Sequence, residues 1–381
     1  MPIDPQQVQN LLREGIIALQ QGRGAEARGR FETLTGAGLA NAQIWLLLAM
    51  ACRAQQDGAA EEAAVDRLLA LEPQNINGLV MKGDCRLRAG DEDLAVNLYK
   101  NALRFGEGQA LSQAEVAELR RVEEEVRRLD SLHAARVETQ LAALGFGPGQ
   151  RSARFQQSLD IMAGRKQVYY QEPTGFYFPG LPQTQYFDTA DFPWVPAVEA
   201  ATDAIRAELS VLLAEGLEGF RPYIRSEEHQ PRYNPLLDNK DWSALFLCEN
   251  GRRFEEAIAR CPKTWEAVQA APQAWIERSS PTIMYSLLRA GARIPAHRGV
   301  NNTRLTCHLP LIVPPGCGFR VGNEVREWRE GEILIFDDSI EHEAWNESAE
   351  DRVVLIFDIE RPEMSAQEKE EVAALYRISI P

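Results

Sequence analysis

The sequence lacks several features that would assign it to a common class of protein. Its six cysteines show no C-x-x-C spacing, and no apolar run approaches the roughly 18 to 20 residues that span a bilayer. Basic residues are not in excess: 56 acidic against 41 basic side chains give a net charge of −15. This balance argues against nucleic acid and against an anionic membrane surface as partner. The scattered cysteines favour reduced thiols over a disulfide framework or a zinc site.

The stretch MPIDPQQVQNLLREG at the N-terminus has neither the basic nor the apolar segment of a signal peptide. We therefore expect a cytoplasmic protein with no membrane span.

Histidine is also scarce, with only five in 381 residues, and three of them lie in the C-terminal part at 297, 308 and 342. We expect the other two, His133 and His229, to be surface residues. Non-haem iron oxygenases usually bind Fe(II) with a His-x-Asp/Glu pair and a distant second histidine. Here His297 is followed two positions later by Gly299, which offers no side chain.

At 381 residues the chain is long enough for two domains, and the two parts differ in composition. Within 1–110, rich in Ala, Leu, Glu and Arg, a self-comparison reveals a repeat: Gly15, Gly22, Ala27 and Phe31 recur as Gly83, Gly90, Ala95 and Tyr99. The offset of 68 is twice the 34-residue period of tetratricopeptide helix pairs. The copy between them is poorer, with Ala49 and Gln56 at the two glycine positions. We predict tetratricopeptide-like helical repeats over 1–110; an unrelated helical bundle is the alternative.

A long charged helix is predicted over 111–142, as a connector or capping helix, and GFGPGQRS then marks a domain boundary. We place the connector at 111–150 and a second domain at 151–381. From 151 onward short β-rich runs such as TIMYSLL, TRLTCHLPLIVP and RVVLIFDIE follow helical segments, at the spacing of a sandwich or barrel. The predicted class is α+β: an all-α repeat domain followed by a jelly-roll domain.

Two positions in the β-rich part suggest a metal site. His297 ends a strand-like run and His342 follows another, so facing strands could bring both to one mouth, where Fe, Mn or Zn could bind. Two histidines 45 residues apart can equally be ordinary residues.

Arg352 opens an apolar strand, where a buried guanidinium needs an anion. In a 2-oxoglutarate-dependent oxygenase, that anion is the distal carboxylate of the cosubstrate. Pairing with Asp351 or exposure to solvent is the simpler alternative.

The stretch from His297 to Met364, and above all GEILIFDDSIEHEAW at 331–345, resembles the aspartyl/asparaginyl β-hydroxylase family. The stretches FYFPGLPQTQYFDTADFPWVPAVEA and DNKDWSALFLCENGRR extend the resemblance to about 170–365. It implies a double-stranded β-helix (jelly-roll, cupin-like) oxygenase domain, which animal members also join to tetratricopeptide-like helices. It further implies Fe(II) held by two histidines with glycine in place of the third ligand, so the absence of a side chain at Gly299 fits the family.

The resemblance assigns a role to each candidate residue. His297 and His342 would bind iron. Arg352, helped by Ser286, would bind the C5 carboxylate of 2-oxoglutarate, with His308 on the C1 side. Trp242 matches a pocket tryptophan, whereas the family does not use Asp337 and Asp338 as ligands, and a hydrogen-bonded turn is expected there.

Two departures from the family pattern concern charge and redox state. Thr306 stands where animal members carry an arginine, so the polar network near the cosubstrate must differ. Animal members have a disulfide pair in this region; here Cys261 is kept but Trp265 stands at the position of its partner. That bridge cannot form, in keeping with a reducing compartment.

The resemblance implies an enzyme that uses Fe(II), 2-oxoglutarate and O₂ to hydroxylate an unactivated C–H bond. The expected target is the β-carbon of Asp or Asn in a peptide or protein, which the repeats could help to hold. One alternative is a hydroxylase of a small molecule or lipid head group. Another is a repeat scaffold that carries a vestigial oxygenase domain.

Overall fold

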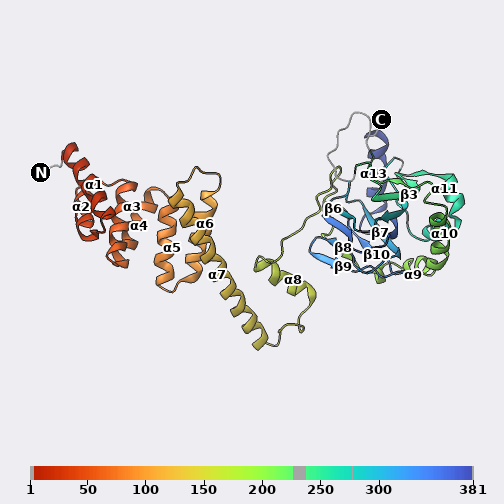
Figure 1. Cartoon of the computed structure of the whole chain (residues 1–381), viewed down its shortest axis with the longest axis horizontal. Coiled ribbons are helices and arrows are strands. Elements are labelled where there is room, and N and C mark those ends of the chain that lie inside the picture. Colours follow the sequence, from red (N-terminus) through yellow and green to blue (C-terminus); the bar gives the residue numbers. More distant parts are fainter. Residues whose placement is uncertain (1–3, 226–236, 277, 380–381) are drawn as a thin grey trace. The chain divides into compact units, whose positions relative to one another are not determined.

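The computed structural model describes residues 4–225, 237–276 and 278–379, which form two compact units, 1–165 and 166–381 (Figure 1). His229 lies outside the described residues. The first unit is all helical, and its helices are α1 (Pro5–Gln20), α2 (Gly24–Gly36), α3 (Ala42–Ala54), α4 (Gly58–Leu71), α5 (Ile76–Arg88), α6 (Glu92–Gly106), α7 (Gln113–Ala143) and α8 (Ala153–Met162). The three-segment division at 110 and 150 stays a prediction; in the structure, α8 belongs to the first unit.

The predicted repeat appears as three consecutive helix pairs, α1/α2, α3/α4 and α5/α6. The second helices of the pairs begin at residues 24, 58 and 92, which are 34 residues apart in each step. Apolar residues from neighbouring pairs share common clusters, so each pair buries a face that it could not bury alone. The all-α repeat prediction for this part of the chain is confirmed.

The glycines found in the repeat are contact points between the two helices of a pair. A Cβ atom added at Gly15 would lie 2.5 Å from Phe31, and one added at Gly83 would lie 2.4 Å from Tyr99. In the middle pair, Ala49 replaces the glycine and Val65 replaces the aromatic ring, and both are fully buried. The larger side chain of Ala49, compared with glycine, is thus matched by the smaller side chain of Val65, compared with an aromatic ring, which keeps the interior filled.

Helix α7 covers the last pair with its N-terminal half. Val122, Val126 and Leu129 are buried in the cluster that contains Tyr99, and Leu119 packs against it. Farther along, His133 is exposed as predicted. None of the helices in the described residues combines the length and the apolar character needed to cross a bilayer.

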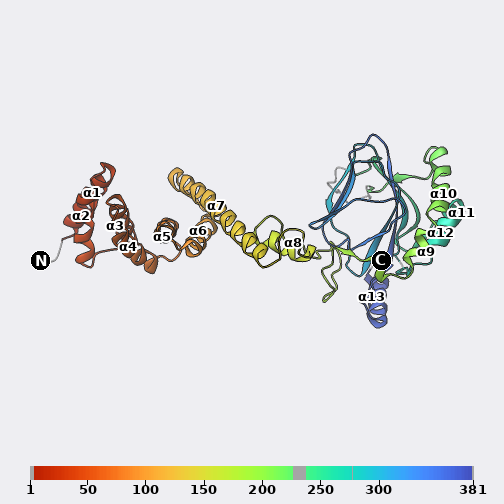
Figure 2. The same cartoon turned by 90° about the horizontal axis from the view of Figure 1, so that it is seen from below.

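The second unit consists of two antiparallel sheets with helices on one side (Figure 2). Its strands are β1 (Tyr186–Phe187), β2 (Arg221–Pro222), β3 (Trp242–Glu249), β4 (Arg252–Arg253), β5 (Ile283–Leu288), β6 (Arg293–His297), β7 (Arg304–Ile312), β8 (Cys317–Val321), β9 (Glu324–Arg326), β10 (Leu334–Phe336), β11 (His342–Asn346) and β12 (Arg352–Glu360). The large sheet has the order β1-β10-β7-β12-β5-β3-β2, with β4 beside β3, and the small sheet has the order β6-β11-β8-β9. The helical elements are η1 (Thr189–Asp191), α9 (Val195–Glu199), α10 (Thr202–Ala214), α11 (Glu255–Arg260), α12 (Pro262–Val268) and α13 (Ala366–Ser379).

The central strands of the large sheet are buried on both faces, and alternation along each strand divides their side chains between two surroundings. Odd-numbered residues such as Leu355 and Phe357 of β12 pack in the main core with α9, α10, α11 and α12. Figure 2 shows these helices together on one side of the sheets. Even-numbered residues of the same strands face the small sheet. The predicted α+β class, with antiparallel sheets after the helical repeats, is therefore confirmed.

Candidate active site

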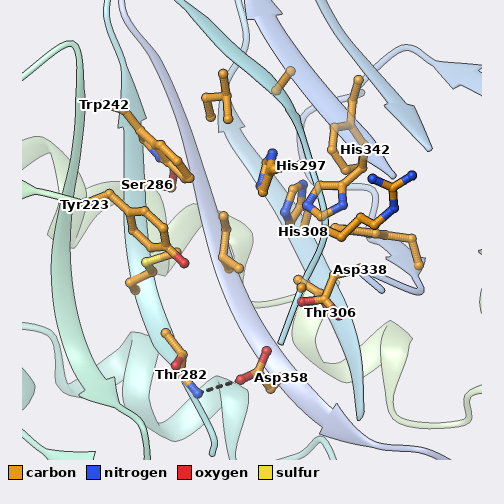
Figure 3. Close-up of a pocket in the computed structure, with 18 of the residues that line it drawn as sticks. Tyr223, Trp242, Thr282, Ser286, His297, Thr306, His308, Asp338, His342 and Asp358 are labelled. Carbon is orange, nitrogen blue, oxygen red and sulfur yellow. Dashed lines mark hydrogen bonds between the residues drawn. The ribbon is translucent and has the colours of Figure 1, made fainter. Parts of the chain in front are cut away.

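A cavity of about 300 Å³ lies between the two sheets, and its lining includes the six residues to which the resemblance gives a binding role: Trp242, Ser286, His297, His308, His342 and Arg352. From the large sheet it is lined by Trp242, Met284, Ser286, Thr306, His308, Arg352, Ile356 and Asp358, all even-numbered. From the small sheet and its loops it is lined by Ile294, His297, Gly299, Phe319, Asp338, His342 and Ala344, among others. Figure 3 shows the three histidines grouped on one side of this space.

His297 and His342 are direct neighbours in the small sheet. They are register partners where β6 pairs with β11, and their ring centroids are 4.1 Å apart. His297 Nδ1 lies 2.8 Å from Pro295 O, and His342 Nδ1 lies 3.0 Å from Ile340 O. Because a carbonyl oxygen only accepts, each Nδ1 carries the proton and each Nε2 keeps its lone pair.

The surroundings keep these rings neutral. Burial, and after it the neighbouring His297, lowers the pKa of His342 to about 3, and burial also lowers the pKa of His297. The pKa of the buried His308 is held well below its usual value by burial and by the charge of Arg352. Neutral imidazoles with a free Nε2 are in the state that binds a metal ion.

Arg352 carries a buried charge that no anion among the described residues balances. Its side chain is fully buried, and none of its three guanidinium nitrogens has a hydrogen-bond partner among the described residues. The guanidinium lies over the ring of Trp328, with Cζ 4.6 Å from the ring centroid. Burial lowers the pKa of Arg352 to about 10, so it is still protonated at neutral pH. Of the alternatives from sequence, pairing with Asp351 does not occur, since that carboxylate binds Arg289 at 2.6 Å.

Ser286 and Trp242 come from neighbouring strands of the large sheet. Trp242 Nε1 donates to Ser286 Oγ at 3.1 Å, so the serine hydroxyl proton is free for another acceptor. The ring of Tyr223 stacks on that of Trp242 at a centroid distance of 4.0 Å, and both are labelled in Figure 3. Tyr223 was not found from the sequence, because it follows strand β2, which has only two residues and shows no alternation.

The space that a third ligand at position 299 would need is occupied by Asp338. A Cβ added at Gly299 would lie 2.3 Å from Asp338 Oδ2, and Gly299 N donates to Asp338 O at 2.7 Å. Asp338 Oδ1 has no hydrogen-bond partner among the described residues, and burial raises the pKa of this carboxyl to about 7. In the described part of the chain, no group of three or more His, Cys, Asp or Glu side chains is arranged to hold a metal ion.

A polar group that sequence reasoning missed lies around Arg304. Its guanidinium is 3.8 Å from Asp338 Oδ2 and 3.6 Å from Asp358 Oδ1, and its Nε has no hydrogen-bond partner in the part of the chain that the structure describes. Asp358 Oδ2 accepts from Thr282 N at 2.8 Å, the contact dashed in Figure 3. Arg304 lies two residues before Thr306 on the same face of β7. Arg304 therefore places a positive charge close to Thr306 on the cavity side of the sheet.

Comparison with known proteins identifies relatives of the second unit. The family model described as Aspartyl/Asparaginyl beta-hydroxylase matches residues 199–362. The ornithine lipid ester-linked acyl 2-hydroxylase of Rhizobium tropici is 37% identical over 198 residues, which are 51% of this chain and 67% of that protein. The aspartyl/asparaginyl beta-hydroxylase of Homo sapiens is also 37% identical, over 146 residues. That match spans 38% of this chain and 19% of the human protein, so the chain corresponds to only a small part of it.

Among solved structures, the helical part is similar to PcrH from Pseudomonas aeruginosa. The match covers 33% of this chain and 93% of PcrH, with a TM-score of 0.30 and 17% sequence identity.

Proposed function

The chain belongs to the aspartyl/asparaginyl β-hydroxylase family, and from this premise we propose that it is an Fe(II)- and 2-oxoglutarate-dependent dioxygenase. One observation carries the proposal: two adjacent neutral histidines and an unbalanced buried arginine face the same cavity. The strands β5 to β12 are divided between the two sheets: the large sheet contains β5, β7, β10 and β12, and the small sheet contains β6, β8, β9 and β11. This division supports a jelly-roll assignment.

His297 and His342 would bind the metal through Nε2, the nitrogen that their backbone contacts leave unprotonated. Gly299 supplies no ligand, so the other coordination positions would be left to water, the cosubstrate and O₂. Fe(II) bound here would supply the redox chemistry by which O₂ and 2-oxoglutarate give a hydroxylated substrate, succinate and CO₂.

Arg352 fits the distal carboxylate of 2-oxoglutarate, because an anion there would balance its charge and satisfy its guanidinium nitrogens. Ser286 could donate its hydroxyl proton to the same carboxylate, since its oxygen already accepts from Trp242. His308, whose Nδ1 has no hydrogen-bond partner among the described residues, would face the other end of the cosubstrate. The two sheets would exclude water from the reacting atoms.

For the substrate we propose the β-carbon of an Asp or Asn residue in a peptide or protein, as the family description suggests. Arg304, Thr306 and Tyr223 line the same cavity and offer polar contacts to such a residue. The helical repeats would help to hold the polypeptide.

A second candidate is a lipid or small-molecule hydroxylase with the same chemistry. The observation in its favour is that the Rhizobium relative, which is named as an acyl 2-hydroxylase of ornithine lipid, matches a larger part of this chain than the human protein does.

The first test is an anaerobic titration of the full chain with Fe(II) and 2-oxoglutarate, followed by the weak visible charge-transfer band of the chelate. The wild type should develop the band, His342→Ala should lose it, and Arg352→Met should require more 2-oxoglutarate. Arg293→Met is the matched control, because Arg293 is exposed on the small sheet and lines no part of the cavity. If the wild type neither binds iron nor shows the band, the dioxygenase proposal is wrong and the scaffold alternative gains support.

The second test separates the substrates. Succinate formation is measured with Asp- and Asn-containing peptides and, in parallel, with ornithine lipid in detergent. Mass spectrometry then locates the added oxygen. A product gaining 16 Da on the β-carbon supports the peptide substrate, and one on the acyl chain supports the lipid substrate.

A further inference from the structure

One loop follows His297, another precedes His342, and each contains a buried polar residue. Residues 298–303 connect His297 to β7, and residues 337–341 connect β10 to His342. Asn302 lies five residues after His297, and Asp337 lies five residues before His342. Both polar side chains are fully buried.

These two residues are bound to each other through Arg361, which is also fully buried. Arg361 Nη1 donates to Asp337 Oδ2 at 2.6 Å and to Asn302 O at 3.1 Å. The ion pair therefore joins the loop after the first histidine to the loop before the second. Asp337 does form a hydrogen-bonded turn as expected, since Ser339 N donates to its Oδ1 at 3.0 Å, but it also makes this connection.

Gln171 makes a second connection between the same two loops. Its Nε2 donates to Asp337 Oδ2 at 2.5 Å, and its Oε1 accepts from Asn302 Nδ2 at 3.0 Å. An amide can do both because it is a donor at one atom and an acceptor at the other. The backbone continues the bridge, since Glu172 N donates to Ser339 O at 3.0 Å and Thr174 N donates to Gly299 O at 2.9 Å.

We propose that Gln171, Asn302, Asp337 and Arg361, the loop junction, are positioning residues that set the separation and orientation of His297 and His342. This inference rests on the proposed function, in which the two histidines bind a metal. A buried polar network whose members are paired with one another resists rearrangement. The loop it fixes at 337–341 also contains Ile340, whose carbonyl orients the ring of His342.

Gln171 is the position at which the proposal can be tested without removing a buried charge. In Gln171→Leu, Asp337 keeps its bond to Arg361, and Asn302 Nδ2 keeps its 2.8 Å bond to Phe178 O. Gln273→Leu is the matched control, because the buried side chain of Gln273 donates to Val268 O at 3.0 Å and, in the described part of the chain, bonds to no residue of the loop junction.

The probe is Co(II) alone, titrated into the full chain and followed by its visible absorption, with the melting temperature measured without metal. Gln171→Leu should lower Co(II) affinity about 10- to 100-fold, as loss of outer contacts of metal ligands usually does. Gln273→Leu should bind Co(II) like the wild type. A purely structural role would lower the melting temperature and leave Co(II) affinity unchanged, and that result would overturn the proposal.

A second measurement needs no variant. Hydrogen–deuterium exchange of the wild type, with and without Co(II), should show increased protection of 171–176, 298–303 and 337–341 together. Protection of the two loops with no change at 171–176 would overturn the proposal. If the wild type binds no Co(II), the proposed function fails and this inference fails with it. If the wild type and Gln171→Leu bind equally, the inference alone fails.

Discussion

The helical repeats and the cavity of the second unit treat interior charges differently. In the repeats, Glu61 is 2% exposed and accepts from Arg53 at 2.8 Å and from Arg88 at 2.6 Å. In the cavity, Arg352 is fully buried with no anionic partner among the described residues, and Arg304 lies 3.6 Å or more from its nearest carboxylates. An interior charge is costly unless it is paired. The repeats satisfy this requirement within the protein, whereas the described residues do not satisfy it for Arg352 in the cavity.

The loop junction shows that this difference is local to the cavity. Arg361 and Asp337 belong to the second unit, are both fully buried, and form an ion pair of 2.6 Å. The fold of the second unit can therefore pair its buried charges. The isolation of Arg352 is therefore a property of the cavity and not of the second unit as a whole.

The largest expected effect is that of Arg352→Met. It should weaken 2-oxoglutarate binding by about 2–5 kcal/mol, since a buried charge-assisted contact is lost. It should leave the stability of the ligand-free protein unchanged or raise it, because an unpaired buried cation is removed. Isothermal titration calorimetry of the Fe(II)-loaded protein and thermal unfolding of the ligand-free protein measure the two quantities.

The counterpart in the repeats is Glu61→Gln. It should lower the stability of the repeats by about 1–2 kcal/mol, since both arginine partners are partly exposed and solvent reduces the loss. It should leave 2-oxoglutarate affinity unchanged. If Arg352→Met destabilised the ligand-free protein as Glu61→Gln does, the contrast between the two regions would be wrong.

Substitution of one glycine in each region tests the same contrast between the helical repeats and the cavity. A Cβ at Gly83 would overlap the Tyr99 ring at 2.4 Å, and one at Gly299 would overlap Asp338 Oδ2 at 2.3 Å. Gly83→Ala should cost about 1–3 kcal/mol by overpacking and should not affect the metal site. Gly299→Ala should displace the Asp338 carboxylate and weaken Co(II) binding, measured by titration. Equal Co(II) affinity in both variants would show that Asp338 has no influence on the site.

Much of this organisation could be predicted from the sequence. The 34-residue period fixed the helix pairs, and the apolar run that begins at Arg352 coincides with β12. Further cavity residues could also have been predicted, because every second residue of a strand lies on the same face. On the face of His308 these are Thr306 and Arg304, and on the face of Arg352 they include Asp358. All of these residues line the cavity.

Other features had no signal in the sequence. Gln171 belongs to a segment without regular secondary structure, and its partners Asn302 and Asp337 are 131 and 166 residues away. The position of Asp338 against Gly299 likewise depends on how two loops meet. A pattern along the chain carries no information on contacts between irregular segments, which only the folded backbone brings together.

A smaller effect concerns pH. Hydrogen bonding to Lys82 lowers the pKa of Glu62 in the repeats, whereas burial raises the pKa of Asp358 in the cavity. A carboxyl with a lowered pKa contributes stability that is lost as the pH falls through its folded-state pKa. One with a raised pKa contributes stability that is lost as the pH rises through that pKa. Glu62→Gln should therefore reduce the loss of stability in acid, and Asp358→Asn should reduce the loss at higher pH.

Hydrogen–deuterium exchange of the full chain at several pH values separates the two responses, because peptides from each unit are read independently. Each group can change the slope of the free energy of unfolding against pH by at most about 1.4 kcal/mol per pH unit. If both variants changed the pH dependence of stability in the same direction, the assignment of Glu62 as ion-paired and Asp358 as buried with an incompletely balanced charge would be wrong.

The smallest expected effect lies in the turn between the helices of each pair. Gly22, Gln56 and Gly90 occupy the same repeat position, with φ angles of 72°, 58° and 81°, so Gln56 adopts a left-handed conformation that favours glycine. Relief of this conformation is worth about 1–2 kcal/mol, and the greater freedom of glycine in the unfolded chain offsets part of it. Gln56→Gly should therefore stabilise the repeats by up to about 1 kcal/mol, measured by denaturant unfolding. The reciprocal change Gly22→Gln should destabilise them by a similar amount, because the same side chain then enters the same left-handed position. A loss of stability in both variants would mean that the Gln56 side chain contributes more to the turn than its backbone conformation costs.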